Sequence, residues 1–272
     1  MTPARPRAKR SLSQNFLIDP NLQRKIVEAL DPEPADIVLE IGAGTGALTH
    51  HLAGRVARLV AVELDDALAE SLAAEFEGRA DVQVVHADAL EIAAERLAGA
   101  PDYKVIGNIP YGITTPIIFH LLDERPRPRV IVLTVQREVA DRLVAKPGNK
   151  TYGALTAGVQ AVAGVEALFK ISRQAFRPVP DVDSTVVRIV PKRPPPLSPA
   201  EEEKFRTLTR AAFSRRRKQL QKVLRQAPEL GLSSPQVDSL LSDLRIDPAT
   251  RPDALPVADY IRLAAALQPD RR

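Results

Sequence analysis

The 272-residue sequence contains no cysteine, no tryptophan and only one methionine. Without cysteine the chain can form neither disulfides nor thiolate metal sites, so disulfide-stabilised secreted folds and zinc ribbons are excluded. We expect no bound metal. No stretch approaches the roughly 18 uninterrupted apolar residues that a membrane-spanning helix requires, and no apolar segment follows the basic amino terminus as it would in a secretion signal. We therefore expect a cytoplasmic protein without a membrane partner.

Positive and negative charges are nearly balanced, with 38 Lys and Arg against 34 Asp and Glu, so the net charge of +4 by itself says little about a partner. The positions of the basic residues say more, because they gather at two places in the sequence. The two clusters are Arg5, Arg7, Lys9 and Arg10, and then Arg215, Arg216, Arg217, Lys218 and Lys222. This pattern favours an anionic partner such as a nucleic acid.

Short apolar runs alternate with helical patterns in the first half of the chain. The runs span residues 37–41, 59–62, 82–85, 104–106 and 130–135. Such runs, separated by helices, are typical of a parallel sheet that is covered on both faces. Asp19 followed by Pro20 is a helix-start signal, so we predict that a helix opens the fold. Residues 165–171 and 184–190, joined by a proline-rich connection, predict an antiparallel pair that closes the sheet.

A proline-rich segment over residues 191–199 predicts a stiff linker between two domains. Beyond it, Ser198, Pro199 and Glu201 form a helix-start signature, and the remaining sequence has further helical patterns. We therefore predict an α/β, Rossmann-like domain over residues 1–193 and a small all-helical domain over residues 194–272.

A glycine-rich loop follows the first predicted strand and precedes a predicted helix. It reads Glu40-Ile41-Gly42-Ala43-Gly44-Thr45-Gly46. Glycines in this position allow the backbone to approach a ligand closely, although a tight strand-to-helix turn is the alternative interpretation. The alternating glycines differ from the G-x-G-x-x-G spacing of dinucleotide sites, so binding of a pyrophosphate is disfavoured.

Two acidic residues stand at the ends of the next two strands. Glu63 ends the second strand, where a carboxylate can accept hydrogen bonds from both hydroxyls of a ribose, and Asp88 follows the third, where it can accept one from an adenine amine. Each acid alone is equally consistent with a strand-end cap. Together with the glycine loop, the set resembles class I S-adenosylmethionine methyltransferases.

The tetrapeptide Asn108-Ile109-Pro110-Tyr111 follows the fourth strand. The Asn108 side-chain oxygen and the Ile109 backbone carbonyl can accept the two N–H bonds of an adenine N6 amine, while Pro110 fixes the turn and Tyr111 stacks on the base. No general base is required, because the methylated ammonium is itself a strong acid. The alternative interpretation is a simple turn, since Asn and Pro both favour turns.

With these motifs, the chain resembles the KsgA/Erm family of ribosomal RNA adenine N6-dimethyltransferases over residues 9 to about 226, most closely the small-subunit KsgA branch. The resemblance implies S-adenosylmethionine as cofactor and a catalytic group formed by the tetrapeptide with Phe176, which would sandwich the target adenine against Tyr111; a core aromatic is the alternative for Phe176. It implies that the cofactor contacts are Asn15, Leu17, Gly42, Gly44, Glu63, Asp88 and Asn108.

The second basic cluster resembles a segment of the small-subunit branch, although an asparagine usual there is replaced near Lys222. We expect it to contact RNA phosphates, which would make residues 194–272 an RNA-binding domain, and a solvated surface is the alternative. The resemblance implies dimethylation of two adjacent adenosines in the terminal hairpin loop of small-subunit ribosomal RNA, in the small subunit or its precursor, by a monomer. Two alternatives remain: Erm-type dimethylation of one adenosine of 23S RNA, which confers macrolide resistance, and a non-catalytic assembly factor on the same fold.

Overall fold

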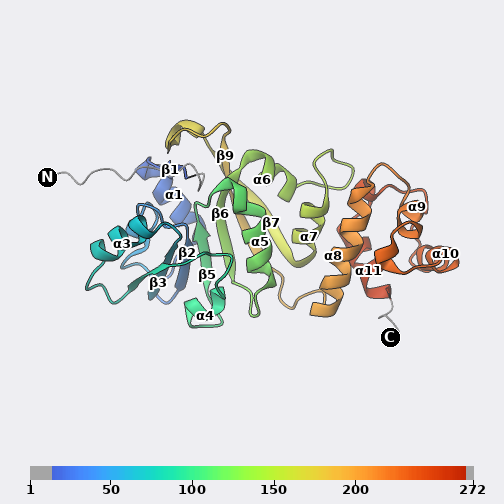
Figure 1. Ribbon diagram of the computed structural model, residues 1–272, viewed down its shortest axis with the longest axis horizontal. Helices are drawn as coiled ribbons and strands as arrows, with labels where there is room; N and C mark the ends of the chain where they lie inside the picture. The colour runs from blue at the N-terminus through green and yellow to red at the C-terminus, as the bar shows by residue number, and fades with distance from the viewer. Residues whose placement is uncertain (1–13, 268–272) are drawn as a thin grey trace. The chain divides into compact units, whose positions relative to one another are not determined.

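The computed structural model describes residues 14–267. Its main sheet has seven strands in the order β4-β3-β2-β5-β6-β9-β7 (Figure 1). They are β2 (Ile37–Ile41), β3 (Arg58–Glu63), β4 (Val82–His86), β5 (Lys104–Gly107), β6 (Val130–Gln136), β7 (Ala163–Ile171) and β9 (Ser184–Pro191). The first five pair in parallel, and β9 runs antiparallel to β6 and lies beside β7. The predicted α/β, Rossmann-like sheet is therefore confirmed.

The strands form where the sequence is β-branched and apolar, and the central ones are buried on both faces. Leu39, Val60 and Ile106 have no exposed surface. Helices connect the strands: α1 (Pro20–Leu30), α2 (Thr49–Leu52), α3 (Asp66–Glu75), α4 (Ala94–Ala98), α5 (Thr114–Asp123) and α6 (Arg137–Leu143). As predicted, Asp19 caps α1, and its side chain accepts from the backbone N–H groups of Asn21 and Leu22.

A second, two-stranded sheet joins the amino-terminal segment to a distant part of the chain. β1 (Phe16–Leu17) pairs antiparallel with β8 (Phe176–Arg177), with Leu17 opposite Phe176. Both of these side chains are buried in the core that contains Ile26 of α1. The ribbon therefore fixes the residues just before it against the main sheet.

The described residues form two compact units, one made of residues 14–140 together with 165–191, and one made of 141–164 together with 192–267. The second contains α7 (Ala154–Val162), α8 (Pro199–Ser214), α9 (Leu220–Arg225), α10 (Ser234–Asp243) and α11 (Val257–Ala266). The predicted Ser198 cap and Glu201 form a capping box at the start of α8. Among the described residues, no helix is long and apolar enough to span a membrane.

This division differs from the predicted one, which placed a single domain boundary between residues 193 and 194. The segment 141–164 belongs with the carboxyl-terminal helices, and α7 within it is a helix that the sequence patterns did not predict. Its neighbour Tyr152 is fully buried and donates a hydrogen bond to the Leu255 carbonyl over 2.9 Å. The Tyr152 ring also packs edge-on against Phe213, at a centroid distance of 5.7 Å. These partners are distant in sequence, so local periodicity could not indicate them.

Candidate active site

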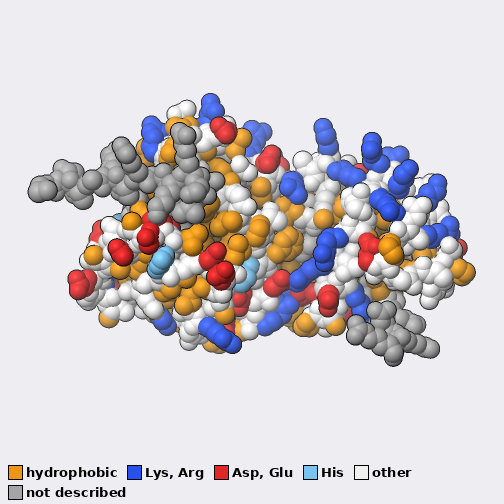
Figure 2. All heavy atoms as spheres, in the orientation of Figure 1, with side chains coloured by type: hydrophobic (Ala, Val, Ile, Leu, Met, Phe, Trp, Pro, Cys, Tyr) orange, Lys and Arg blue, Asp and Glu red, His pale blue; other side chains and the backbone are white. Residues whose placement is uncertain are grey.

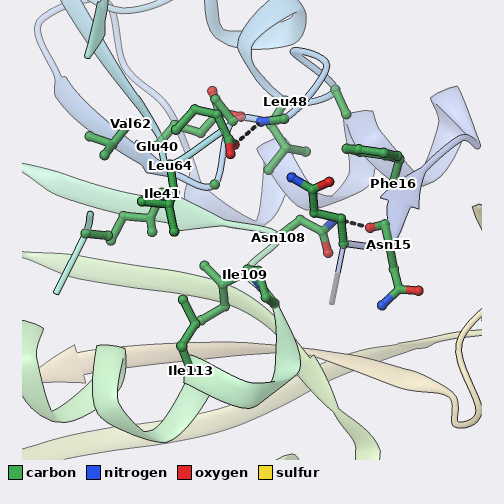
Figure 3. A pocket seen from close by; sticks show the side chains of 18 of the residues that line it. Asn15, Phe16, Glu40, Ile41, Leu48, Val62, Leu64, Asn108, Ile109 and Ile113 are labelled. Carbon is green, nitrogen blue, oxygen red and sulfur yellow. Dashed lines mark hydrogen bonds between the residues drawn. The ribbon is translucent and has the colours of Figure 1, made fainter. Parts of the chain in front are cut away.

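A cavity of about 320 Å³ lies at the carboxyl edge of the parallel strands (Figure 3). It is lined by residues 14–17, 40–45, 47–48, 62–64, 87–89 and 108–113. Four of these stretches follow or end β2, β3, β4 and β5, because the carboxyl ends of parallel strands meet at one edge of the sheet. Residues 47–48 follow the glycine loop, and residues 14–17 reach the same place through the ribbon of β1 and β8. The size and position of the cavity are those of a small-molecule site.

The glycine loop after β2 requires glycine for its backbone conformation and for close packing. Gly42, Gly44 and Gly46 have positive φ angles of 71°, 57° and 79°. A Cβ on Gly44 would lie 3.4 Å from the ring of Phe16, and one on Gly46 would lie 2.5 Å from His50. Gly42 and Gly44 line the cavity, whereas Gly46 does not. The first two glycines thus shape the cavity wall, and the third permits packing behind it.

Glu63 lies at the end of β3 and is 6% exposed. One carboxylate oxygen accepts from the Gly44 N–H over 2.7 Å and the other from the Asp65 N–H over 2.9 Å. A carboxylate has about four acceptor positions, so these two bonds leave capacity for a ligand. Asp88 also lines the cavity, and its carboxylate accepts from the Leu90 N–H over 2.8 Å. Each acid therefore stabilises a loop and faces the cavity.

Glu40 is a third carboxylate on the cavity wall, and sequence reasoning noted it without giving it a role. It is 1% exposed and accepts a hydrogen bond from the Thr49 hydroxyl over 2.7 Å. Burial, which disfavours the charged form, is the main cause that raises the pKa of Glu40 to about 7, and the charge of the nearby Glu63 contributes to this rise. The signal in the sequence was a glutamate inside an otherwise apolar strand.

The charge of the cavity wall has one sign. Glu40, Glu63 and Asp88 are its acidic residues, and its described lining includes no lysine, arginine or histidine. A phosphate-bearing ligand normally meets a cation or a row of free amide donors, so this wall is poorly suited to a dinucleotide. It suits a ligand that carries positive charge and several hydrogen-bond donors.

The tetrapeptide after β5 contributes all four of its residues to the cavity wall. The Asn108 side-chain amide donates to the Asn15 carbonyl over 3.2 Å, an arrangement that Figure 3 marks with a dashed line. The amide nitrogen is thereby occupied, which leaves the side-chain oxygen of Asn108 as an acceptor. The Tyr111 hydroxyl forms a 2.7 Å hydrogen bond with the Ser184 hydroxyl. The structure thus brings Asn15, the glycine loop, both predicted acids and the tetrapeptide together.

Phe176 does not lie where the resemblance placed it. Its side chain has no exposed surface and packs in the core with Leu17 and Ile26. It is absent from the residues that line the cavity. Because Phe176 sits on β8 opposite Leu17, its ring is directed inward to anchor the ribbon. The expectation that Phe176 stacks on a base is therefore replaced by the alternative of a core aromatic. Leu17 belongs both to the core and to the cavity wall, since it is 2% exposed and lines the cavity.

The second basic cluster lies in the helical unit, with Arg215 to Lys218 on the turn between α8 and α9 and Lys222 on α9. Arg216 forms a 3.1 Å ion pair with Asp253 and donates to the Lys150 carbonyl, so it holds the unit together. Arg215 donates to Gln226. Arg217, Lys218 and Lys222 are exposed, and Figure 2 shows Lys and Arg side chains gathered over this unit. The first basic cluster, with Arg5, Arg7, Lys9 and Arg10, lies outside the described residues.

Comparison with known proteins gives the family. Residues 5–268 match the family model described as ribosomal RNA adenine dimethylase. The chain is 42% identical to ribosomal RNA small subunit methyltransferase A of Geobacillus kaustophilus, over 96% of this chain and 91% of that protein. It is 41% identical to the protein of the same name from Geobacter metallireducens, over 96% of each chain.

Two solved structures are also similar over nearly the whole chain. A dimethyladenosine transferase from Plasmodium falciparum has a TM-score of 0.80 at 28% identity, covering 91% of this chain and 95% of that one. The 23S rRNA methyltransferase ErmE has a TM-score of 0.71 at 28% identity, covering 93% of this chain and 99% of that one. Both the sequence and the fold, with its acidic cavity beside an Asn-Ile-Pro-Tyr turn, therefore place this chain in the ribosomal RNA adenine dimethylase family of methyltransferases.

Proposed function

We propose that the protein transfers methyl groups from S-adenosylmethionine to the N6 amines of two adjacent adenosines in the 3′-terminal hairpin loop of small-subunit (16S) ribosomal RNA. One observation carries this proposal: the glycine loop, three carboxylates and the tetrapeptide from Asn108 to Tyr111 line a single cavity whose described lining has no cationic side chain. The relatives that are named as small-subunit methyltransferases, at 41% and 42% identity, support the choice of the small subunit.

The cavity fits the proposed cofactor by its charge. S-adenosylmethionine supplies a methyl group on a positively charged sulfur, and its amino group is also cationic. Glu63 and Asp88 are suited to accept hydrogen bonds from its ribose hydroxyls and adenine amine. Glu40 is the third acid, and a cationic ligand beside it favours its charged form. Gly42 and Gly44 keep the wall free of side chains, so that the ligand can contact the backbone.

The tetrapeptide is suited to hold the substrate amine. The lone pair of an adenine N6 amine is delocalised into the ring, so the enzyme must orient the amine toward the methyl group. The side-chain oxygen of Asn108 and the backbone carbonyl of Ile109 would accept its two N–H bonds, and the amide of Asn108 is already oriented by Asn15. Positioning of this kind supplies most of the acceleration, since no proton must be removed before transfer.

The exposed part of the basic cluster is the proposed contact for RNA phosphates. Arg217, Lys218 and Lys222 are free to contribute charge without losing an ion pair that the structure records. Phosphate contacts would set the register of the RNA, while the cavity would select the base. The predicted monomeric state and cytoplasmic location stay predictions, as does the assignment of RNA binding to residues 194–272.

A methylation assay tests the proposal. Purified protein would be given labelled S-adenosylmethionine with undermethylated small subunits or with large-subunit RNA, and modified positions would be mapped by reverse-transcriptase stops. We expect label at two adjacent adenosines of the small subunit only. Label in 23S RNA would favour an Erm-type activity, and label in neither RNA would refute the proposed methyltransferase activity.

The Asn108→Ala variant tests the role of the acceptor. We expect its single-turnover rate to fall by at least about 100-fold, because the amine loses its orientation. S-adenosylmethionine affinity, RNA affinity and the circular dichroism spectrum should stay close to those of the wild type. The matched control is Asn149→Ala, which removes an exposed asparagine from a turn outside the cavity. Equal rates in the two variants would refute the role of Asn108.

A further inference from the structure

We propose that Ser184 is a positioning residue for methyl transfer: its buried hydroxyl holds the ring of Tyr111 in the orientation on which the target base stacks. The observation behind this proposal is the 2.7 Å hydrogen bond between the two hydroxyls, which joins residues 73 positions apart. The inference rests on the proposed function, because it concerns the base that the cavity would receive.

Ser184 is a rigid anchor. It is the first residue of β9, has no exposed surface, and stands opposite Gln136 in the antiparallel pairing with β6. The preceding residue is also fixed, since the Asp183 carbonyl accepts from the Arg137 N–H over 3.0 Å. A hydroxyl on a fully buried residue of a paired strand, flanked by backbone hydrogen bonds, has little freedom to move.

Tyr111, in contrast, lies outside the sheet on a short segment. It begins the 3-10 turn Tyr111–Ile113, in which the Ile113 N–H donates to the Pro110 carbonyl over 3.2 Å. The next residue, Gly112, is exposed and has nothing near the position of a Cβ. A tyrosine ring turns about two side-chain bonds, so a contact at the far end of the ring is the most effective restraint on its face.

The bond is placed to orient the ring without covering it. Tyr111 is half-buried and lines the cavity, whereas Ser184 does not line it. The hydroxyl is therefore held away from the cavity by β9 while the ring remains part of the wall. Burial raises the pKa of the Tyr111 phenol above its usual value, so the phenol is protonated at neutral pH and the bond persists under assay conditions.

A double-mutant cycle tests the proposal. Ser184→Ala and Tyr111→Phe each remove the bond from one side, and both keep the stacking face of the ring. We expect each variant to lower the single-turnover rate by roughly tenfold, which is the loss of one hydrogen bond of typical strength, and the double variant to be no slower than either. Losses that multiply in the double variant would overturn the proposal.

The control removes a different buried hydroxyl from the neighbouring strand. Thr134 on β6 is fully buried, and its hydroxyl has no hydrogen-bond partner among the described atoms, so Thr134→Val changes the core without touching Tyr111. We expect this variant to keep the wild-type rate. If Ser184→Ala is folded and matches Thr134→Val in rate, Ser184 has no positioning role.

Fluorescence separates this proposal from the proposed function. The probe is the 3′-terminal hairpin RNA with 2-aminopurine in place of either adjacent adenine, whose emission falls when the base stacks on a ring. We expect wild type and Thr134→Val to quench it, and Ser184→Ala and Tyr111→Phe to quench it several-fold less. Absence of methyl transfer by the wild type would refute the proposed function alone. Equal quenching by wild type and Ser184→Ala would overturn the role of Ser184, whatever the methylation result.

Discussion

Substitution of Phe176 gives the sharpest distinction between a core aromatic and a residue that stacks on the substrate. The ring is fully buried, and its neighbours include Leu17 and Ile26. Phe176→Ala would remove a large apolar side chain from this core and leave a cavity behind it. We therefore expect a loss of about 3–5 kcal/mol in the free energy of unfolding. Phe176→Leu keeps most of the volume and should cost about 1–2 kcal/mol.

The two variants should also differ in activity, with the less stable variant being the less active one. Because Phe176 pairs with Leu17 on the ribbon, its loss would loosen residues 14–17 on the cavity wall. Phe176→Ala should thus weaken S-adenosylmethionine binding as well as folding, while Phe176→Leu should retain near-normal turnover. A residue that stacks on the base would behave in the opposite way, since leucine offers no aromatic face.

Urea unfolding monitored by circular dichroism measures the first quantity, and single-turnover rates at a temperature where both variants are folded measure the second. Tyr111→Ala is the comparison variant, because Tyr111 does line the cavity. We expect it to lose base binding with a smaller change in stability. If Phe176→Leu is as stable as the wild type yet as inactive as Tyr111→Ala, the interpretation of Phe176 as a core residue is refuted.

Three further predictions concern Glu40 and the basic cluster. Burial raises the pKa of Glu40 from 4.5 to about 7, so the stability that this group contributes is fully present below pH 4.5 and is lost as pH rises toward 7. Glu40→Gln should remove this loss and unfold at higher urea than the ligand-free wild type at pH 8; identical pH profiles would contradict this. Replacing Arg217 and Lys218 by alanine should reduce the slope of log affinity for RNA against log salt by about 1–2, without a change in stability. Arg216→Ala should instead cost about 1 kcal/mol of stability, because it breaks the contacts with Asp253 and Lys150, and an unchanged urea midpoint would argue against that role.

The sequence by itself determined the features whose causes are local. The apolar runs predicted the parallel strands because a strand buried on both faces needs apolar side chains at every position. Asp19 and Ser198 predicted helix starts because a capping side chain bonds to amides two or three residues away. The glycine loop and the tetrapeptide were also recognisable, because each is a motif of neighbouring residues. The edge of the sheet at which they meet also followed, since strands in a parallel sheet all end on one side.

Only the tertiary structure decided the features that depend on partners distant in the chain. The sequence could not tell whether Phe176 faces the cavity or the core, because that depends on its pairing with Leu17 across the ribbon. It could not tell that Arg216, and not Arg217, has a structural role, because that role depends on an ion pair with the distant Asp253. The raised pKa of Glu40 is of the same kind, since burial comes from the packing of the whole sheet. Local patterns specify backbone conformation, but the direction and environment of a side chain are set by the long-range contacts that folding creates.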